Sequence, residues 1–237
     1  MPTADQQSQY CAIFGDIIAS REIMERDDLQ KRLLLGLDSI NSKFSGQLVA
    51  PLRFTAGDEV RGLLKDESES YAVIKLLQSA ASPHKMRLAV GIGEISTEPL
   101  RDIAAIDGPA LHRASSAMQL LKSRKLSHGR TVYYCSGNAD RDAMLNGLTF
   151  LVSSIKSRWT QSMHEKAELL SSGLTQMELG ARLGVSHQAV RQSMVRANYY
   201  ALVEGERLIE SLLSDCSPTR LQCEIATHID CNQSMQL

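Results

Sequence analysis

The stretch YCAIFGDII, at residues 10–18, decides the fold. Five hydrophobic residues in succession are followed by Gly15 and Asp16, which is typical of a buried strand that ends in a loop. Outward from this strand, apolar residues recur at helical spacing through residues 27–44, which predicts an amphipathic helix. The residues that carry this spacing are Leu29, Leu33, Leu37, Ile40 and Phe44.

Residues 48–55 and 60–64 are the next two predicted strands, and the turn at Gly57-Asp58 joins them into a hairpin. Pro51 lies within the first of these strands and implies a sheet edge or a bulge, because proline has no N–H to donate. Further along, we predict a helix over residues 67–81, a strand over 86–95, a helix from Pro109 with a face of alanines, and a strand over 131–135.

The first six elements follow the order βαββαβ, which predicts a ferredoxin-like, palm-type domain of the α+β class. We expect an antiparallel sheet with the first two helices on one face. The first strand and the first strand of the hairpin are expected at its centre.

After Asn146 the pattern becomes helical, and no further strand is indicated. One long helix is predicted from the spacing of Leu148, Leu151, Ile155, Trp159 and Met163. The predicted organisation is a palm-type domain at residues 1–142, an all-α domain at 143–213 and a polar tail at 214–237.

The composition is that of an ordinary globular protein, with 237 residues, 43% hydrophobic, 22% charged and a net charge of -1. This balance excludes broad electrostatic adhesion to nucleic acid or to an anionic membrane, so any DNA contact must come from a local patch. The sequence contains no CxxC pair, no signal-like N-terminus and no membrane-length apolar run, which favours a cytoplasmic protein. Free thiols are a better interpretation of the tail than a metal set of Cys216, Cys223, His228 and Cys231.

A helix-turn-helix is predicted at residues 174–200, LTQMELGARLGVSHQAVRQSMVRANYY. Thr175 and Glu178 form a capping box, and Gly184 permits the left-handed turn between the helices. Small Gly180 allows the two helices to approach closely, and Ser186 caps the second helix. The inner faces are assigned to Leu179 and Leu183 on the first helix and to Val190 and Met194 on the second.

The outer face of the predicted second helix carries polar and basic side chains that are suited to double-stranded DNA. Arg191 is expected to pair with guanine, Gln188 or Gln192 with adenine, and Arg182 and Arg196 with phosphates. The full set of predicted DNA-contacting residues is Arg182, Ser186, His187, Gln188, Arg191, Gln192 and Arg196. A helical dimerisation module with solvated arginines is the alternative interpretation.

Two carboxylates are expected at one edge of the predicted sheet, because Asp16 ends the first strand and Asp58 lies at the tip of the neighbouring hairpin. Such a pair is a usual way to hold Mg²⁺ or Mn²⁺ together with a nucleoside triphosphate. Glu59 and Glu94 are candidates for a supporting part. Aspartate is also common in turns for conformational reasons alone, which leaves a purely structural interpretation open.

The segments FGDII, RFTAGDE and RLAVGIGEI resemble the core of class III nucleotidyl cyclases, and the hairpin is similar to that of GGDEF domains. The resemblance covers residues 10–135 and implies that Asp16 and Asp58 are metal ligands. It implies a nucleotide site that contains Ile17, Arg21, Gly57, Glu59, His112 and Arg113. His112 and Ser116 stand where cyclases carry the Asn and Arg of the transition state, so the resemblance implies binding rather than catalysis.

The motifs GDI with Ser20-Arg21, the GDE hairpin, DGPA at 107–110 and the C-terminal helix-turn-helix together resemble the SatD family. The leading hypothesis is a homodimeric DNA-binding transcriptional regulator whose cyclase-like domain binds a nucleotide and a divalent metal. An active nucleotidyl cyclase or related phosphoryl-transfer enzyme is the alternative. A non-catalytic interaction protein is the third possibility.

Overall fold

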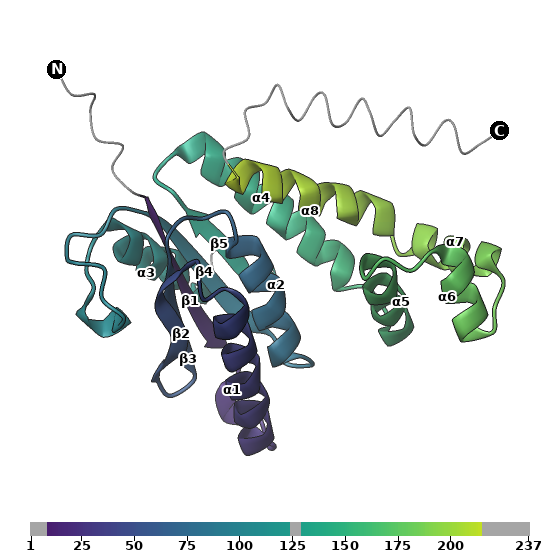
Figure 1. The fold of residues 1–237 in the computed structure, drawn as a ribbon, viewed down its shortest axis with the longest axis horizontal. Helices are drawn as coiled ribbons and strands as arrows, with labels where there is room; N and C mark the ends of the chain where they lie inside the picture. Colours follow the sequence, from purple (N-terminus) through teal and green to yellow (C-terminus); the bar gives the residue numbers. More distant parts are fainter. Residues whose placement is uncertain (1–8, 124–128, 215–237) are drawn as a thin grey trace.

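The computed structural model describes residues 9–123 and 129–214 (Figure 1). Its strands are β1 (Tyr10–Ile17), β2 (Leu48–Ala56), β3 (Glu59–Leu64), β4 (Met86–Gly93) and β5 (Val132–Cys135). Its helices are α1 (Arg26–Lys43), α2 (Ser70–Ala81), α3 (Pro109–Lys122), α4 (Ala139–Lys156), α5 (Gln161–Ser171), α6 (Gln176–Leu183), α7 (His187–Arg196) and α8 (Tyr199–Leu213). Two short 3-10 helices lie at Ser20–Glu22 and Ile103–Ala105.

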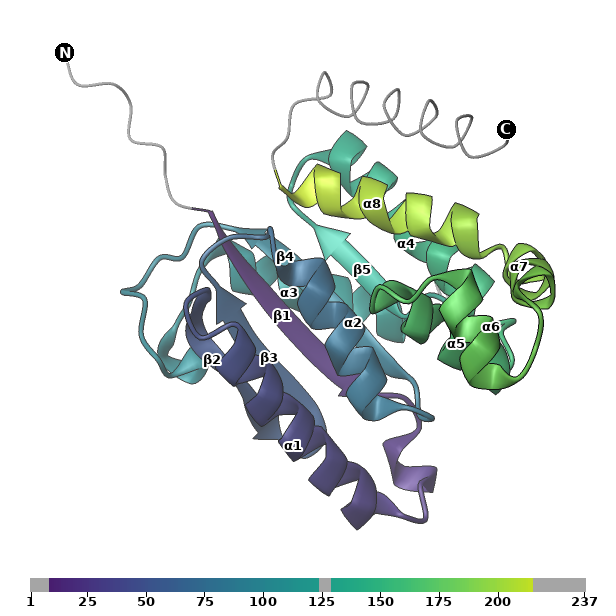
Figure 2. The ribbon, with the colours of Figure 1, turned by 45° about the vertical axis from the view of Figure 1, so that its right-hand side comes forward.

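The five strands form one sheet in the order β2-β3-β1-β4-β5, in which only the β4-β5 pair is parallel. The first four strands have the predicted ferredoxin-like topology, so the α+β fold is confirmed. One detail of the expected topology is wrong, because β3 and not β2 lies beside β1 (Figure 2). β2 takes the edge because Pro51 removes a donor and the pairing of β2 with β3 shifts register three times, whereas β3 pairs with β1 without a shift.

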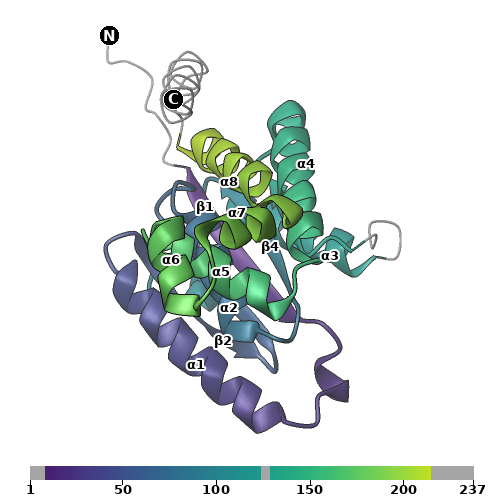
Figure 3. The same cartoon turned by 90° about the vertical axis from the view of Figure 1, so that its right-hand side faces the viewer.

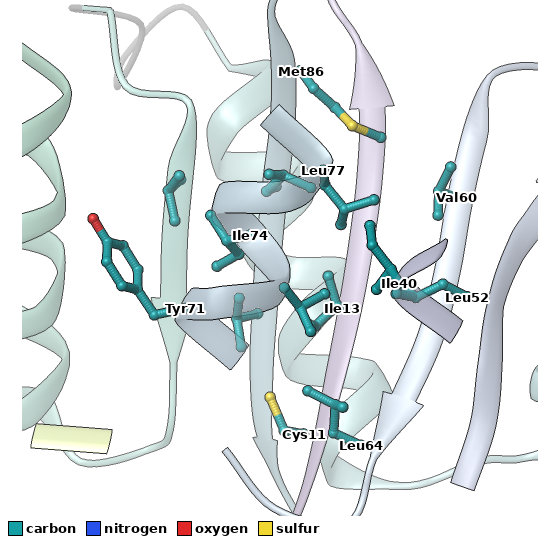
Figure 4. Close-up of a cluster of buried hydrophobic side chains, with 14 of the residues drawn as sticks. Cys11, Ile13, Ile40, Leu52, Val60, Leu64, Tyr71, Ile74, Leu77 and Met86 are labelled. Atoms are coloured by element: carbon teal, nitrogen blue, oxygen red, sulfur yellow. The ribbon is translucent and has the colours of Figure 1, made fainter. Parts of the chain in front are cut away.

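Helices cover both faces of the sheet. Figure 2 shows α1 and α2 together on one face, as predicted, and α3 on the other. The core under α1 and α2 is drawn in Figure 4, where Ile40 and Ile74 converge on Ile13 of the central strand. All five residues that predicted α1 are buried, so the periodicity identified the buried face of this helix correctly.

α3 packs closely against β4 because both elements carry small residues where they meet. Ala110, Ala114 and Ala117 are fully buried on the helix. A Cβ placed on Gly91 of β4 would lie 2.0 Å from the carbonyl oxygen of Ala110 and 2.3 Å from the amide nitrogen of Ala114. The glycine at position 91 is therefore required by backbone contact.

The predicted single helix through residues 148–163 is wrong, because the chain breaks between α4 and α5. Thr160 caps α5 by accepting a hydrogen bond from the amide of Met163. The indole N–H of Trp159 donates to the carbonyl oxygen of Ala197 at 2.7 Å, which ties the break to the end of α7. Leu151 lies on the exposed side of α4, and Val152 is buried instead.

α4 and α8 pack side by side and join the core of the sheet (Figure 3). The buried cluster that contains Ile13 and Ile17 of β1 also contains residues of these two helices, namely Leu145, Val152, Leu202, Ile209 and Leu213. The predicted boundary between residues 142 and 143 falls within α4. α5, α6 and α7 lie beyond the ends of these two long helices, at the right of Figure 1. No helix of the described ranges combines the length and the hydropathy needed to span a membrane.

Asn146 of α4 completes the edge of the sheet at β5. Its side-chain oxygen accepts from the amide of Tyr134 and its side-chain nitrogen donates to the carbonyl of Tyr134, both at 2.8 Å. Both residues are buried, so neither backbone group can reach water in the absence of Asn146.

We expect Asn146→Ala to lower the free energy of unfolding by about 2–4 kcal/mol, because it leaves a buried donor and a buried acceptor unsatisfied. The measurement is urea denaturation followed by circular dichroism. Asn138→Ala is the matched control, because Asn138 only caps the exposed start of α4 and its loss should cost about 1 kcal/mol. Equal losses for the two variants would contradict this account of the β5 edge.

Candidate functional site

Asp16, the first predicted metal ligand, lies near the end of β1 and is only 8% exposed. Alternate residues of β1 face opposite sides of the sheet, so Ala12, Phe14 and Asp16 face α3, while Ile13 and Ile17 face α1 and α2. The carboxylate of Asp16 is therefore directed to the α3 side.

Two cations hold the Asp16 carboxylate. Oδ2 accepts a hydrogen bond from Nη1 of Arg87 at 3.0 Å, and Oδ1 lies 3.0 Å from Nζ of Lys122. Arg87 is opposite Asp16 on β4, and Lys122 is the last residue of α3. The sequence reasoning missed both cations, although an arginine within the apolar strand MRLAVGIG was a visible signal.

The charge network continues to Glu59, at the start of β3. Its carboxylate pairs with Lys122 at 3.2 Å and with Arg61 at 3.1 Å. Partial burial disfavours the charged form of Lys122, but its hydrogen bonds to Asp16 and Glu59 outweigh this and raise its pKa above the usual value. The guanidinium of Arg61 also covers the ring of Phe14, 4.6 Å from its centroid. Three cations and two carboxylates thus meet here, beside a cavity of about 150 Å³.

Asp58, the second predicted metal ligand, lies in the two-residue hairpin turn after Gly57, whose φ is +59°. It lines a different cavity of about 230 Å³, between the hairpin tip and α1. Ile17, Ser20, Arg26 and Gly57 also line this cavity, so the structure places the predicted residues Ile17, Gly57 and Asp58 together there.

The two aspartates are not arranged as a metal centre in this structure. Both oxygens of Asp16 are paired with cations, and Asp16 is not among the residues that line the cavity beside Asp58. Across the described ranges 9–123 and 129–214, no group of three or more His, Cys, Asp or Glu side chains is positioned to hold a metal ion. Metal binding by Asp16 and Asp58 stays a prediction, and it would require Lys122 and Arg87 to be displaced.

His112, Arg113 and Glu94 lie at the opposite end of the sheet from Asp16. In the β1-β4 pair, Asp16 is opposite Arg87 and Tyr10 is opposite Gly93. Six residues of strand therefore separate the two ends, which is about 20 Å. His112 pairs there with Asp107 at 2.8 Å, and Arg113 donates to the carbonyl of Ile92.

Some of the predicted residues fall outside what the structure describes. Arg21 lies in the 3-10 helix Ser20–Glu22, but its side chain is not described. The tail from residue 215 onward, with Cys216, Cys223, His228 and Cys231, is likewise outside the described ranges.

The local geometry of α6, the turn and α7 matches the sequence analysis in most details. Thr175 and Glu178 form the capping box, and Gly184 has a φ of +67°. Ser186 caps α7 by accepting from the amide of Ala189. A Cβ on Gly180 would lie 2.8 Å from the carbonyl oxygen of Val185, so this position requires glycine for close approach.

The buried side of these two helices differs from the prediction at one residue. Leu179, Val190 and Met194 are fully buried, but Leu183 is 41% exposed. Leu183 is the last residue of the short α6, directly before the turn at Gly184. The chain leaves the helix there, so no following helical turn covers the Leu183 side chain.

All seven predicted DNA-contacting residues are exposed on α6, the turn and α7. Residues 173–203 hold three arginines and one glutamate, an excess of two positive charges, although the whole chain is slightly acidic. The exposed sides of α6 and α7 therefore carry a local excess of positive charge.

Comparison with known proteins identifies the SatD family, whose sequence profile matches residues 10–195. Among solved structures, the chain is similar to a bacterial light-regulated adenylyl cyclase, with 15% identity and a TM-score of 0.39. That similarity covers 54% of this chain and 76% of the cyclase chain. No curated protein matches the sequence.

Proposed function

The chain belongs to the SatD family, and we propose that this member is a DNA-binding transcriptional regulator that reads double-stranded DNA with α7. The main support for this proposal is the contrast between the two sides of α7. Val190 and Met194 are fully buried, whereas the predicted DNA-contacting residues are all exposed. A recognition helix that enters the major groove requires this division.

The charge pattern favours DNA over the alternative of a dimerisation module. A helix that packs against a second helix presents an apolar stripe outward. The outer side of α7 instead presents Gln188, Arg191 and Gln192, whose side chains match the edges of adenine and guanine.

The test is a selection from random DNA duplexes with the full chain, followed by fluorescence anisotropy on the enriched sequence. We expect one enriched motif, bound at about 10 nM at physiological salt and at least about a thousandfold more tightly than random DNA. A selected pool that binds no better than the starting pool would overturn the proposal.

A homodimer forms part of the proposal. Two-fold symmetry would give two copies of α7 and a palindromic site with half-sites spaced one helical turn of DNA apart. Any site that used His112 or Arg113 together with Asp16 would also need two chains, because these residues lie at opposite ends of the sheet.

Nucleotide binding, with Mg²⁺ or Mn²⁺, is the second candidate function. The favouring observation is the cavity of about 230 Å³ at the hairpin tip, where Arg26, Ser20 and Asp58 could meet the phosphates and metal of a ligand. Incubation with ATP, GTP, CTP and UTP plus either metal, followed by mass spectrometry, tests for catalysis, because binding alone leaves the triphosphates intact. A cyclic or linked nucleotide that disappears in Asp58→Ala would make the chain a nucleotidyl cyclase or related enzyme.

We expect Lys122→Met to raise the affinity for Mn²⁺ about tenfold, because Lys122 competes with any divalent ion for Asp16. Electron paramagnetic resonance of free Mn²⁺ measures this affinity. Lys31→Met removes a lysine from the exposed side of α1 and should leave it unchanged. Equal Mn²⁺ affinity in the wild type and Lys122→Met, or a gain that persists when Asp16→Asn is added, would contradict competition at Asp16.

A further inference from the structure

Val195 is an apolar residue on the outer side of α7. It is 55% exposed, whereas Val190 and Met194 of the same helix are fully buried. Each residue turns the helix by about 100° around its axis, so Gln192 points directly away from Val190 and Met194. Gln188 and Val195, on neighbouring turns, point within about 60° of the Gln192 direction. Gln188, Gln192 and Val195 therefore form one outward stripe, which we call the α7 stripe.

Val195 stabilises α7 less than an alanine would at the same position. Valine is a poorer helix former than alanine, because its branched side chain loses rotamer freedom against the preceding turn. With more than half of its surface exposed, it also gains little from burial in the fold. Its side chain is therefore available for a contact outside the chain.

The stripe has the spacing and chemistry of a base-reading surface. Together with Arg191 beside it, the stripe occupies positions 188, 191, 192 and 195, which have the i, i+3, i+4, i+7 spacing of one helix face. A recognition helix in the major groove turns such a face toward the base edges. Only one of these four positions is apolar, whereas a helix that docks into a protein groove carries apolar anchors at this spacing.

We propose that the α7 stripe reads A·T pairs, with Gln188 and Gln192 hydrogen-bonded to adenine and Val195 in contact with the C5-methyl group of thymine. This rests on the proposed DNA binding and specifies its ligand. Glutamine matches the N6 and N7 groups of adenine, and an apolar side chain in the groove recognises the thymine methyl. Arg191 and Arg196 flank the stripe on either side, where they contact guanine and phosphate.

The experiment replaces thymines of the selected DNA, one at a time, by deoxyuridine, which lacks only the methyl group. Anisotropy is measured for the full wild-type chain, for Val195→Ala and for the control Leu151→Ala, which removes an exposed aliphatic side chain from α4. We expect one replacement to weaken wild-type binding about fourfold, the equivalent of ~0.8 kcal/mol for one buried methyl. The same replacement should leave Val195→Ala unaffected, and Leu151→Ala should behave as the wild type.

Each other outcome overturns the inference in a recognisable way. If no deoxyuridine replacement weakens specific binding, thymine recognition is overturned and DNA binding stands. The same holds if a replacement weakens the binding of Val195→Ala as much as that of the wild type. A selected motif without A·T pairs at its core does the same. Failure to enrich any DNA overturns the inference together with the proposed function. Val195→Ala keeps the fold in any case, because alanine is the better helix former at an exposed site.

Discussion

Gly91→Ala is expected to lower the free energy of unfolding by about 3–5 kcal/mol, one of the largest losses for a single methyl group. The added methyl would lie 2.0 Å and 2.3 Å from backbone atoms of α3, so relief requires the whole helix to move away from β4. Overpacking of side chains usually costs about 1–3 kcal/mol. A clash with backbone atoms costs more than that, because backbone cannot move aside as a side chain can, and we expect the free energy of unfolding to fall by about 3–5 kcal/mol. This loss is a large part of a typical total stability of about 5–15 kcal/mol.

The matched control is Gly147→Ala, the same substitution within α4. Nothing lies within 4 Å of a Cβ at this position, so only the gain in helix propensity remains. We expect Gly147→Ala to raise the free energy of unfolding by about 0.5–1 kcal/mol. Urea denaturation of both variants gives the two values. A Gly91→Ala protein within 1 kcal/mol of wild type would mean that α3 does not approach β4 so closely.

Local patterns predicted the elements that depend on local physics. The spacing of Leu29, Leu33 and Leu37 fixed the buried face of α1, because burial of a helix depends on its own period. The capping box at Thr175 and Glu178 is equally local, and the structure contains it as predicted.

Features that depend on distant contacts could not be predicted in the same way. The break between α4 and α5 is stabilised by Trp159, whose partner Ala197 lies 38 positions along the chain. The apolar spacing continues through this break, so periodicity alone indicated one helix.

The candidate site at Asp16 shows the same limit. Its partner Arg87 lies 71 positions away on β4, and Lys122 lies farther still, at the end of α3. The aspartate was recognisable from the sequence, but its electrostatic surroundings depend on how β1, β4 and α3 pack. Those surroundings decide whether its carboxylate meets a metal ion or a lysine.

Gln188→Ala combined with Arg191→Ala is expected to weaken specific DNA binding at least thirtyfold. Each residue is placed to make one bidentate base contact, and each such contact contributes about 1–3 kcal/mol of discrimination. Together they account for at least about 2 kcal/mol, which corresponds to that factor. Both side chains are exposed, so the double variant should fold as the wild type does.

The affinity of the same double variant for random DNA shows whether the lost contacts are to bases or to phosphates. Nonspecific binding depends on phosphate contacts, so the affinity for random DNA should fall far less than the affinity for the selected site. Arg207→Ala is the control, because it removes an exposed arginine from α8 and should change neither affinity. An equal loss on both DNAs would make Arg191 a phosphate contact without base recognition. No loss on either would place the DNA-binding surface elsewhere and favour α7 as a dimerisation helix.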